Sequence, residues 1–455
     1  MTATPAATES ANAETRPAAI WRLAWPVILS NATVPLVGLV DTAIMGHLPD
    51  PAFIGGVALG GLIFSYVYWG FGFLRMATTG LAAQASGGGD VDELRAVLAR
   101  ALLIAALAGL ICVGGGRWLA DLALWLLSGT AAVEEQARLY FTIRVLAAPA
   151  ALANTAVLGW LFGIRAMGGA LIQQLTVNAA NILFNLLFVF GLGLDVDGVA
   201  WASVAAQYLG LAVSILLLRH HLRRVGGGFD RSRILAAKPL ARLFKINLDI
   251  FIRTLAVISG TALFMDASAA AGTVVLAANA VLLNLQTLAA HGLDGFAHAT
   301  ESLVGRAIGA RAPARLAAAV RNSSVMALAL GAAIGLTYFV AGGWIIAALT
   351  TIDAVRASAL IYLPWAAAAP VISVAAFQLD GIFIGATRSR EMRDTMVLSL
   401  FAFWAALQVA GDLAGTHGLW FAYVLFLGLR GAALALYYPR VRALTAGEAA
   451  ATRAT

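Results

Sequence analysis

The stretch GFGFLRMATTGLAAQASGG at residues 70–88 returns as GLDGFAHATESLVGRAIGA at residues 292–310, about 222 residues later. Both copies are mostly apolar and end in a glycine-rich turn. A second pair, LGWLFGIRAMGG from Leu158 and DGIFIGATRSRE from Asp380, has the same spacing, and GVAWAS and GLWFAY form a third pair. Three matches in the same order predict a duplicated chain whose two halves share one topology.

The composition is typical of a membrane protein. Of the 455 residues, 61% are hydrophobic and 12% are charged, and the mean hydropathy is +0.86. A soluble domain carries roughly 45–50% apolar and about 25% charged residues. These values exclude a soluble globular protein, a disordered chain and a nucleic-acid-binding module. The net charge of +7 is instead expected to lie in cytoplasmic loops.

Twelve apolar runs are long enough to cross a bilayer, which takes about 20 residues. They comprise residues 20–46, 53–80, 94–127, 133–163, 168–192, 198–221, 241–267, 272–304, 313–349, 355–386, 392–413 and 417–439. The runs 94–127 and 313–349 exceed one straight span, and we expect each to contain a short second helix. We therefore predict an all-α integral membrane protein with twelve transmembrane helices in two pseudo-symmetric six-helix lobes.

The loops predict the domain limits and the orientation. We expect a disordered cytoplasmic N-terminus (1–19), an N-terminal lobe (20–221), a basic cytoplasmic linker (222–240), a C-terminal lobe (241–440) and a cytoplasmic tail (441–455). Most cations lie in loops that follow even-numbered helices, so both termini are predicted to be cytoplasmic. The N-terminus lacks the pattern of a cleavable signal peptide, so the first apolar run is expected to remain a span.

One carboxylate, Asp41, lies in the first apolar run, which has no other ionisable residue between Pro26 and Gly46. Ionisable side chains inside a span are costly and mark functional sites. Burial disfavours a charged carboxylate, so Asp41 is predicted to bind and release a proton near neutral pH. Pro26 and Pro35 each remove a backbone hydrogen bond and permit this helix to bend. The alternative is a helix-end aspartate at the outer surface.

The N-terminal lobe also contains uncharged polar side chains within its spans. Asn181 and Asn185 lie four residues apart on one face of the fifth helix, which also holds Asn178. Ser203 follows in the sixth helix, and Asn154 lies in the fourth. We expect these side chains either to join helices by hydrogen bonds or to contribute to the proton site.

The C-terminal lobe holds more charged side chains. Asp249 and Arg253 are spaced as an intrahelical ion pair, and Asp380 lies in the tenth helix. Four side chains at steps of three, four and three residues share one face of the eighth helix: His291, Asp294, His298 and Glu301. We interpret this stripe as a structural polar network or as a second proton or substrate site, and a metal site is a weaker alternative.

The source of energy is predicted from motifs that the sequence lacks. No GxxxxGK[ST] loop occurs, because neither Lys238 nor Lys245 follows a glycine, and no GxSxG motif is present. We therefore expect an ion gradient to supply the energy, and we expect no enzyme activity, cofactor or bound metal.

The sequence PVILSNATVPLVGLVDTAIMGHL from Pro26 resembles the first helix of multidrug and toxic compound extrusion (MATE) transporters. Four further strings resemble the DinF branch of that family: FLRMATTGLAAQASG, NLDIFIRTL, LDGFAHATESLVG and FQLDGIFIGATRSREMRDTM. The resemblance covers about residues 20–440. It implies efflux of organic cations and other amphipathic compounds against H+ or Na+, with Asp41 as the acid and Pro26 as the bending proline of the first helix.

The resemblance also bears on the coupling ion. Many members carry NxxxD in the fifth helix, whereas here Asn181 matches the asparagine and Asn185 replaces the aspartate. Ser203 stands where a threonine is common. These departures remove a carboxylate ligand and so disfavour sodium. Other branches use acids in helices seven and ten, where Asp249 and Asp380 lie, although Asp380 is about one turn from the usual position.

We predict a proton-coupled multidrug antiporter of the inner membrane that works by alternating access. It is expected to be a monomer that binds small organic substrates and no nucleic acid. Three alternatives stay open: a sodium-coupled antiporter, a flippase for lipid-linked precursors, and a membrane-embedded metalloenzyme that uses the stripe on the eighth helix. A flippase would favour an arginine-lined cavity, whereas cations within the spans are fewer than acids.

Asp41→Asn is expected to abolish drug resistance, because asparagine keeps the shape of the side chain but cannot titrate. Resistance of cells that express the variant is compared with wild type at matched amounts of membrane-inserted protein. Resistance equal to wild type would refute the predicted role of Asp41.

Overall fold

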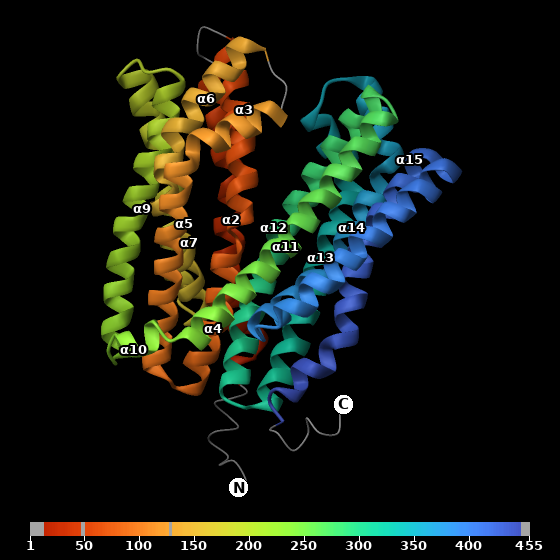
Figure 1. Cartoon of the computed structure of the whole chain (residues 1–455). Coiled ribbons are helices and arrows are strands. Elements are labelled where there is room, and N and C mark those ends of the chain that lie inside the picture. The colour runs from red at the N-terminus through yellow and green to blue at the C-terminus, as the bar shows by residue number, and fades with distance from the viewer. Residues whose placement is uncertain (1–12, 47–50, 127–129, 447–455) are drawn as a thin grey trace. The chain divides into compact units, whose positions relative to one another are not determined.

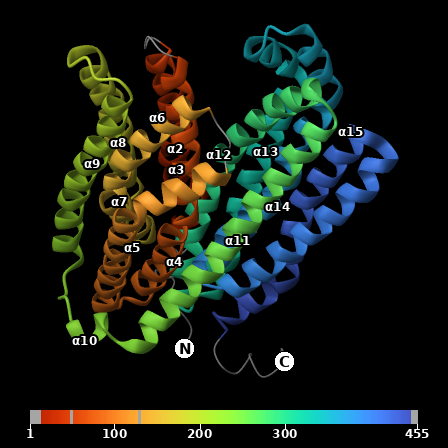
Figure 2. The same cartoon turned by 45° about the horizontal axis from the view of Figure 1, so that its top comes forward.

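The computed structural model describes residues 13–46, 51–126 and 130–446, except for the side chains at positions 35, 36, 39, 41, 42, 45, 51 and 126. Nearly all of these residues are helical, and no β-strand occurs among them. The helices, shown in Figures 1 and 2, are α2 (Pro17–Met45), α3 (Pro51–Gly70), α4 (Phe73–Gly88), α5 (Val91–Leu126), α6 (Ala131–Arg144), η1 (Val145–Ala147), α7 (Ala148–Gly163), α8 (Met167–Asn185), η2 (Leu186–Gly191), α9 (Val196–Val225), α10 (Arg231–Ile234), α11 (Ala237–Ala270), α12 (Thr273–Gly309), α13 (Pro313–Leu349), α14 (Asp353–Gly385) and α15 (Ser389–Ala443).

These helices account for the twelve predicted spans. Ten segments of the described residues are long and apolar enough to cross a membrane. One of them, α15, contains two predicted spans, because the helix is interrupted at Gly415, where φ is 54° and ψ is −132°. The helix α2 covers the first predicted span. The chain is therefore an all-α, multi-pass membrane protein, as predicted.

The prediction of a short second helix within the runs 94–127 and 313–349 is wrong. The described part of each run lies in a single helix, α5 with 36 residues and α13 with 37. At about 1.5 Å per residue, α5 is longer than the roughly 30 Å hydrocarbon core of a bilayer. The helix does not break, and its first turn carries the charged side chains of Asp92 and Glu93, which suit a position outside that core.

Two other predicted spans are divided. The second span comprises α3 and α4, which are separated next to Gly70 and Gly72. The fourth comprises α6 and α7, which the 3-10 turn η1 joins, and Pro149 lies in the first turn of α7. Proline lacks the amide hydrogen that an uninterrupted helix would need at this point.

The described part of the N-terminus differs from the predicted disorder over residues 1–19. The helix α2 begins at Pro17, and Thr15 is only 5% exposed. The backbone carbonyl of Thr15 accepts a hydrogen bond of 2.8 Å from Asn322 of α13, and Glu14 lies 3.7 Å from Arg306 of α12. These contacts hold residues 14 and 15 against two helices.

The predicted repeat is evident in the turns. Three pairs of residues that are 222 positions apart adopt the left-handed backbone conformation: Gly89 (φ 72°) and Arg311 (φ 50°), Arg165 (φ 65°) and Thr387 (φ 54°), Gly193 (φ 67°) and Gly415 (φ 54°). This conformation is uncommon for residues other than glycine. Three pairs of helices also begin 222 positions apart, namely α5 and α13, α6 and α14, and α8 and α15. The two halves therefore share one architecture.

Glycine lets two helices approach closely at equivalent places in each half. A Cβ atom on Gly159 of α7 would lie 2.4 Å from the carbonyl oxygen of Arg75 in α4. The equivalent Gly381 of α14 would place a Cβ atom 2.5 Å from the carbonyl oxygen of Ala297 in α12. Both distances are below van der Waals contact, so a larger residue requires the backbones to separate.

The contacts divide the chain into two units. The C unit comprises Met1–Ile28, Gly87–Gly89 and Lys245–Thr455, and the N unit comprises Leu29–Ser86 and Asp90–Phe244. The helices α2 and α11 each begin in one unit and continue in the other. Within the N unit, α3 packs on α6, α5 on α7 and α8 on α9, and within the C unit α14 packs on α12, α13 and α15 (Figure 2). The predicted limits of the two lobes stay a prediction.

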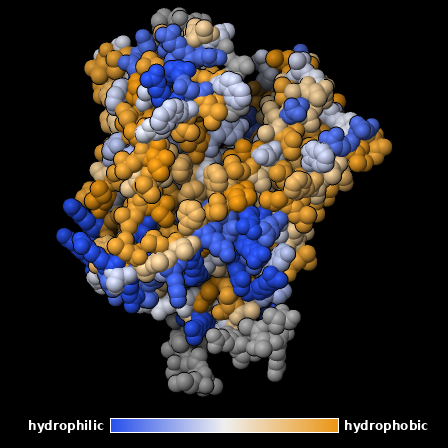
Figure 3. Space-filling view, viewed as in Figure 1, coloured by the Kyte–Doolittle hydropathy of each residue, from blue (hydrophilic) through white to orange (hydrophobic). Residues whose placement is uncertain are grey.

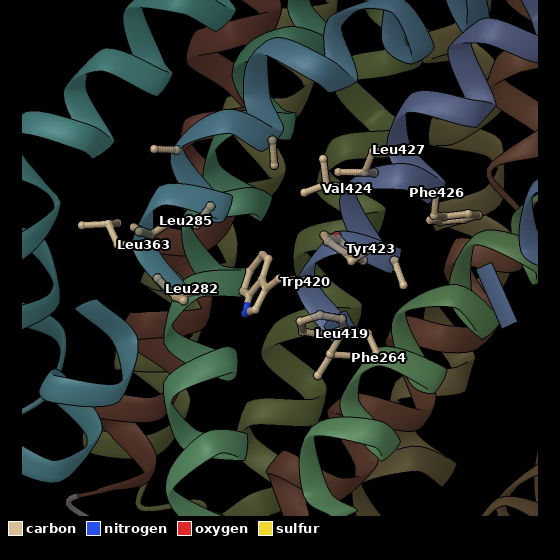
Figure 4. Packing of buried hydrophobic residues seen from close by; sticks show 14 of the residues in the cluster. Phe264, Leu282, Leu285, Leu363, Leu419, Trp420, Tyr423, Val424, Phe426 and Leu427 are labelled. Atoms are coloured by element: carbon tan, nitrogen blue, oxygen red, sulfur yellow. The ribbon is translucent and has the colours of Figure 1, made fainter. Parts of the chain in front are cut away.

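Aromatic and aliphatic side chains together form a core of the C unit (Figure 4). Trp420 of α15 is fully buried, and its ring lies 5.1 Å from the ring of Phe264 in α11. Its Nε1 donates a hydrogen bond of 2.9 Å to Asn279 of α12, so the buried indole is fully satisfied. Tyr423 packs on Phe264 at 4.7 Å.

The predicted basic linker is tied to the start of α5. Arg233 of α10 pairs with Asp90 at 2.8 Å, and Arg100 of α5 donates to the backbone carbonyl of Arg233 at 2.6 Å. Arg95 donates to the carbonyl of Leu222 at 2.8 Å. Through these contacts the linker belongs to the N unit.

Large apolar side chains cover outward faces of the helices, as the orange areas in Figure 3 illustrate. Trp118, Trp125 and Trp344 are at least 75% exposed, and Leu413 and Leu436 at least 80%. Lipid solvates such side chains, whereas water would not. The exposed faces therefore fit a bilayer.

Gly159→Ala and Gly381→Ala are expected to destabilise the protein by similar amounts, about 1–3 kcal/mol, because the added methyl group overpacks a backbone contact. Thermal unfolding of the purified protein in one detergent, followed by tryptophan fluorescence, measures the effect. Gly114→Ala is the control, because nothing lies within 4 Å of a Cβ atom at this helical position. Unfolding of both contact variants at the wild-type temperature would contradict the proposed packing.

Candidate functional site

A cavity of about 270 Å³ lies within the N unit. The helices α3, α6, α7, α8 and α9 surround it, together with η1 and one residue of α2. Its lining is aromatic, apolar or uncharged and polar, apart from one arginine: Val37, Phe64, Ser65, Tyr68, Trp69, Arg144, Ala147, Ala151, Val177, Asn178, Asn181, Ser203, Ala206 and Gln207. A mostly apolar cavity with a few polar groups is typical of sites for small organic molecules.

Three of the predicted polar residues form a chain of hydrogen bonds. Asn185 Nδ2 donates to Asn181 Oδ1 at 3.1 Å, and Asn181 Nδ2 donates to Ser203 Oγ at 3.1 Å. Asn181 and Ser203 line the cavity, whereas Asn185 is fully buried and does not. Asn178, which also lines the cavity, donates to Thr33 of α2 at 2.6 Å. The polar face of α8 thus connects α2 and α9.

Asn154 of α7 belongs to a second network. Its side-chain amide donates to the carbonyl and the side chain of Gln207 at 2.9 and 3.1 Å and accepts from Ser214 at 2.8 Å. Gln173 of α8 donates to the backbone carbonyl of Asn154 at 2.9 Å. Gln207 lines the cavity, so this network joins three helices around it. The sequence prediction omits Gln173, Gln207 and Ser214, although polar side chains in apolar helices are the signal that identifies them.

Two further cavity residues go beyond the sequence prediction, namely Arg144 at the end of α6 and Tyr68 of α3. The guanidinium of Arg144 lies 4.6 Å from the centre of the Phe64 ring and donates to the hydroxyl of Tyr140. The Tyr68 ring stacks on Phe64 with 4.4 Å between centroids. An arginine inside the predicted span 133–163 is the signal that could identify this part of the site.

The backbone of Asp41 lies in α2, but its side chain is outside the described residues. Its role in proton coupling therefore stays a prediction. Pro26 is buried in the part of α2 that belongs to the C unit, and the helix continues through it.

The charged residues of the C unit pair between helices. Arg253 of α11 pairs with Asp380 of α14, which also accepts at 3.2 Å from Arg430 of α15. Asp249 accepts a hydrogen bond of 2.6 Å from Arg393 of α15. The predicted pair between Asp249 and Arg253 is therefore wrong, because each residue finds its partner on a neighbouring helix.

These carboxylates are deeply buried. Asp249 is 2% and Asp380 is 8% exposed, and Ser389 also donates to Asp249 at 2.8 Å. A buried charge is tolerated when it is paired and hydrogen-bonded. The sequence prediction omits Arg393 and Arg430, because pairing partners on distant helices leave no local spacing to recognise.

The predicted stripe on α12 supplies one ion-pair contact, between His298 Nδ1 and Glu301 Oε1 at 3.1 Å. Glu301 is 1% exposed, and His291 and Asp294 also make contacts. No group of three His, Cys, Asp or Glu side chains that could hold a metal ion occurs in the part of the chain that the structure describes. The metalloenzyme alternative thus has no ligand set there.

The polar pair on α8 of the N unit has apolar counterparts in the C unit. At positions 222 residues after Asn181 and Asn185, the chain carries the apolar side chains of Phe403 and Leu407. Phe403 is fully buried in the apolar core of the C unit, and Leu407 packs against that core. One architecture therefore surrounds a polar cavity in one unit and a packed apolar core in the other.

Comparison with known proteins places this geometry in a family. A family model described as MatE matches residues 26–187 and 250–433. The chain is 40% identical over 426 residues to DNA damage-inducible protein F of Escherichia coli K12. The matched region covers 93% of this chain and 92% of that protein. It is 28% identical over 419 residues to a probable multidrug resistance protein NorM of Caulobacter vibrioides, with 87% and 86% covered.

A solved structure confirms the fold. The crystal structure of MATE in the bent conformation has a TM-score of 0.86 at 18% sequence identity, and the match covers 95% of this chain and 97% of that chain. Together with the relatives above, this likeness confirms the resemblance and the fold class that the sequence predicts.

The charges around Asp380 predict a large effect on stability. Asp380→Asn is expected to destabilise the protein by about 3–5 kcal/mol, because two buried arginines lose their carboxylate. Asp353→Asn is the control, since the Asp353 side chain is 98% exposed, and we expect a change of about 0.5 kcal/mol or less. Thermal unfolding of both variants in detergent provides the comparison, and equal unfolding temperatures would contradict the structural role of Asp380.

Proposed function

Because this chain belongs to the MatE family, we propose that it is a secondary active transporter that exports amphipathic organic compounds, cationic ones among them, in exchange for protons. Transport proceeds by alternating access. The protein is a transporter of small molecules and not an enzyme.

The observation that carries this proposal is the cavity in the N unit. It lies among membrane-spanning helices and combines aromatic surfaces of Phe64, Tyr68 and Trp69 with amide groups of Asn178 and Asn181. Aromatic and apolar walls suit the body of an amphipathic compound, and a few polar groups orient it. The volume of about 270 Å³ suits a small molecule or part of a larger one.

Asp41 is the proposed proton carrier. Two buried acids of the C unit, Asp249 and Asp380, form ion pairs with arginines. Asp41 is the carboxylate that the apolar sequence of α2 favours for titration. Protonation and substrate binding are linked through the conformation, because each ligand shifts the equilibrium by its differential affinity for the two states.

Sodium is the less favoured coupling ion. A sodium site needs several oxygen ligands, and the fifth helix offers Asn185 in place of a carboxylate. Asn181 and Ser203 supply neutral oxygens and already bond to each other at 3.1 Å. A flippase is also less favoured, because the cavity lining includes one arginine, whereas an arginine-rich lining would suit that function.

The proposal extends to location and assembly. We place the protein in the inner membrane. Because basic residues gather in the loops after even-numbered helices, we propose that both termini lie in the cytoplasm. We propose a monomer, since one N unit by itself contains the cavity.

Proteoliposomes with an imposed gradient test the proposal. An imposed pH gradient at zero sodium is expected to drive uptake of a fluorescent amphipathic cation, and Asp41→Asn is expected to abolish it. The Asp353→Asn variant, altered at an exposed side chain, serves as the control. Transport driven by a sodium gradient and not by a pH gradient would overturn proton coupling. Failure of either gradient to drive transport of both a cationic and an anionic amphipathic compound would overturn the function.

A further inference from the structure

The charge of the cavity points to a substrate class. Arg144 is the one formally charged side chain among the lining residues that the structure describes. No carboxylate of those residues lies within ion-pair distance of it. By contrast, Arg138 on the same helix pairs with Asp121, and the buried Arg253 and Arg430 pair with Asp380. An arginine within a span is costly, and one with no carboxylate partner among the described residues calls for a functional explanation.

The neighbours of Arg144 hold its guanidinium without neutralising it. The group lies 4.6 Å from the ring centre of Phe64 and 5.3 Å from that of Tyr140, and it donates to the Tyr140 hydroxyl. These contacts engage the face of the guanidinium and one of its five N–H donors. The other donors have no hydrogen-bond partner among the described side chains, so an acceptor in the cavity can engage them.

A second donor lies in the same cavity wall. The hydroxyl of Tyr68 is buried and has no hydrogen-bond partner among the described residues. Its ring stacks on Phe64, the same ring that contacts Arg144. Burial of a hydroxyl without a hydrogen-bond partner costs free energy, and a hydrogen bond to a bound acceptor would offset that cost. The guanidinium and the phenol thus flank one aromatic ring and offer donors without a described acceptor.

We propose that this cavity binds the carboxylate of an amphipathic organic anion, with Arg144 and Tyr68 as the groups that recognise the charge. The inference rests on the proposed function and names a substrate class for the same site. A carboxylate accepts two parallel hydrogen bonds from a guanidinium, which gives both strength and orientation. The apolar body of the anion lies against Phe64, Trp69 and Val177.

Binding of two matched probes to the purified protein in lipid nanodiscs tests the inference. Naphthaleneacetate and naphthylethylammonium have the same aromatic body and opposite charges. Titration calorimetry is expected to give an affinity for the anion at least about tenfold higher than for the cation. Arg144→Gln is expected to lower the affinity for the anion by about tenfold or more and to leave that for the cation unchanged or higher. Tyr68→Phe is expected to lower the affinity for the anion by a few-fold.

The control is Arg138→Gln, which removes an exposed cation from the same helix, six residues earlier. It is expected to leave the affinity for both probes unchanged. Arg144→Lys keeps the charge and should retain part of the affinity for the anion, which keeps the test valid if the glutamine variant fails to fold. Equal affinity of wild type and Arg144→Gln for the anion, or equal loss in Arg138→Gln, would overturn the inference.

Transport separates this inference from the proposed function. If the anion binds through Arg144 but no gradient drives transport of either probe into proteoliposomes, the proposed function fails and the binding site stands. If a pH gradient drives transport of the cation while Arg144→Gln leaves binding of the anion unchanged, the substrate class fails and the function stands.

Discussion

The close approach of two helix backbones in each unit is the constraint on which the rest of the structure depends. Gly159 and Gly381 permit it, and one turn later Gly163 and Gly385 extend it, since a Cβ atom on Gly385 would lie 2.4 Å from the carbonyl oxygen of Glu301. This contact fixes α4 against α7 and α12 against α14. The turns at Arg165 and Thr387 follow directly, so the next helix in each half starts at the equivalent residue.

Within that shared architecture the two units have different interiors. The N unit has amides and a serine around a cavity, whereas the C unit fills the equivalent positions with Phe403 and other apolar side chains. The C unit instead buries acids and arginines elsewhere, with Asp380 between two guanidinium groups. The two halves thus keep the same backbone contacts while their interior side chains differ. The close approach of the helices depends on glycine, whereas ligand binding depends on the side chains that face the interior.

Much of the fold follows from local patterns in the sequence. Hydropathy and the repeat predict the spans, and the four-residue spacing of Asn181 and Asn185 predicts their shared face, because these signals lie within one helix. The ion pairs between helices do not follow from such local patterns. Arg253 lies four residues from Asp249 yet pairs with Asp380, because the choice depends on how α11 packs on α14. The sequence reveals Arg144 as an arginine inside a predicted span, but its role depends on the side chains that surround it in the cavity.

The two helices that pass from one unit to the other have a mechanical consequence. The change of unit falls at Ile28 in α2 and at Phe244 in α11, in each case inside a continuous helix. If one unit moves relative to the other, α2 and α11 have to bend. Bending lengthens the backbone hydrogen bonds on the convex side of each helix. Pro26 lies close to the crossing point in α2 and lacks an amide hydrogen, whereas Pro239 of α11 lies in the first turn, where no such bond is lost. The two helices therefore differ in stiffness, and α2 is the helix that bends more easily near its change of unit.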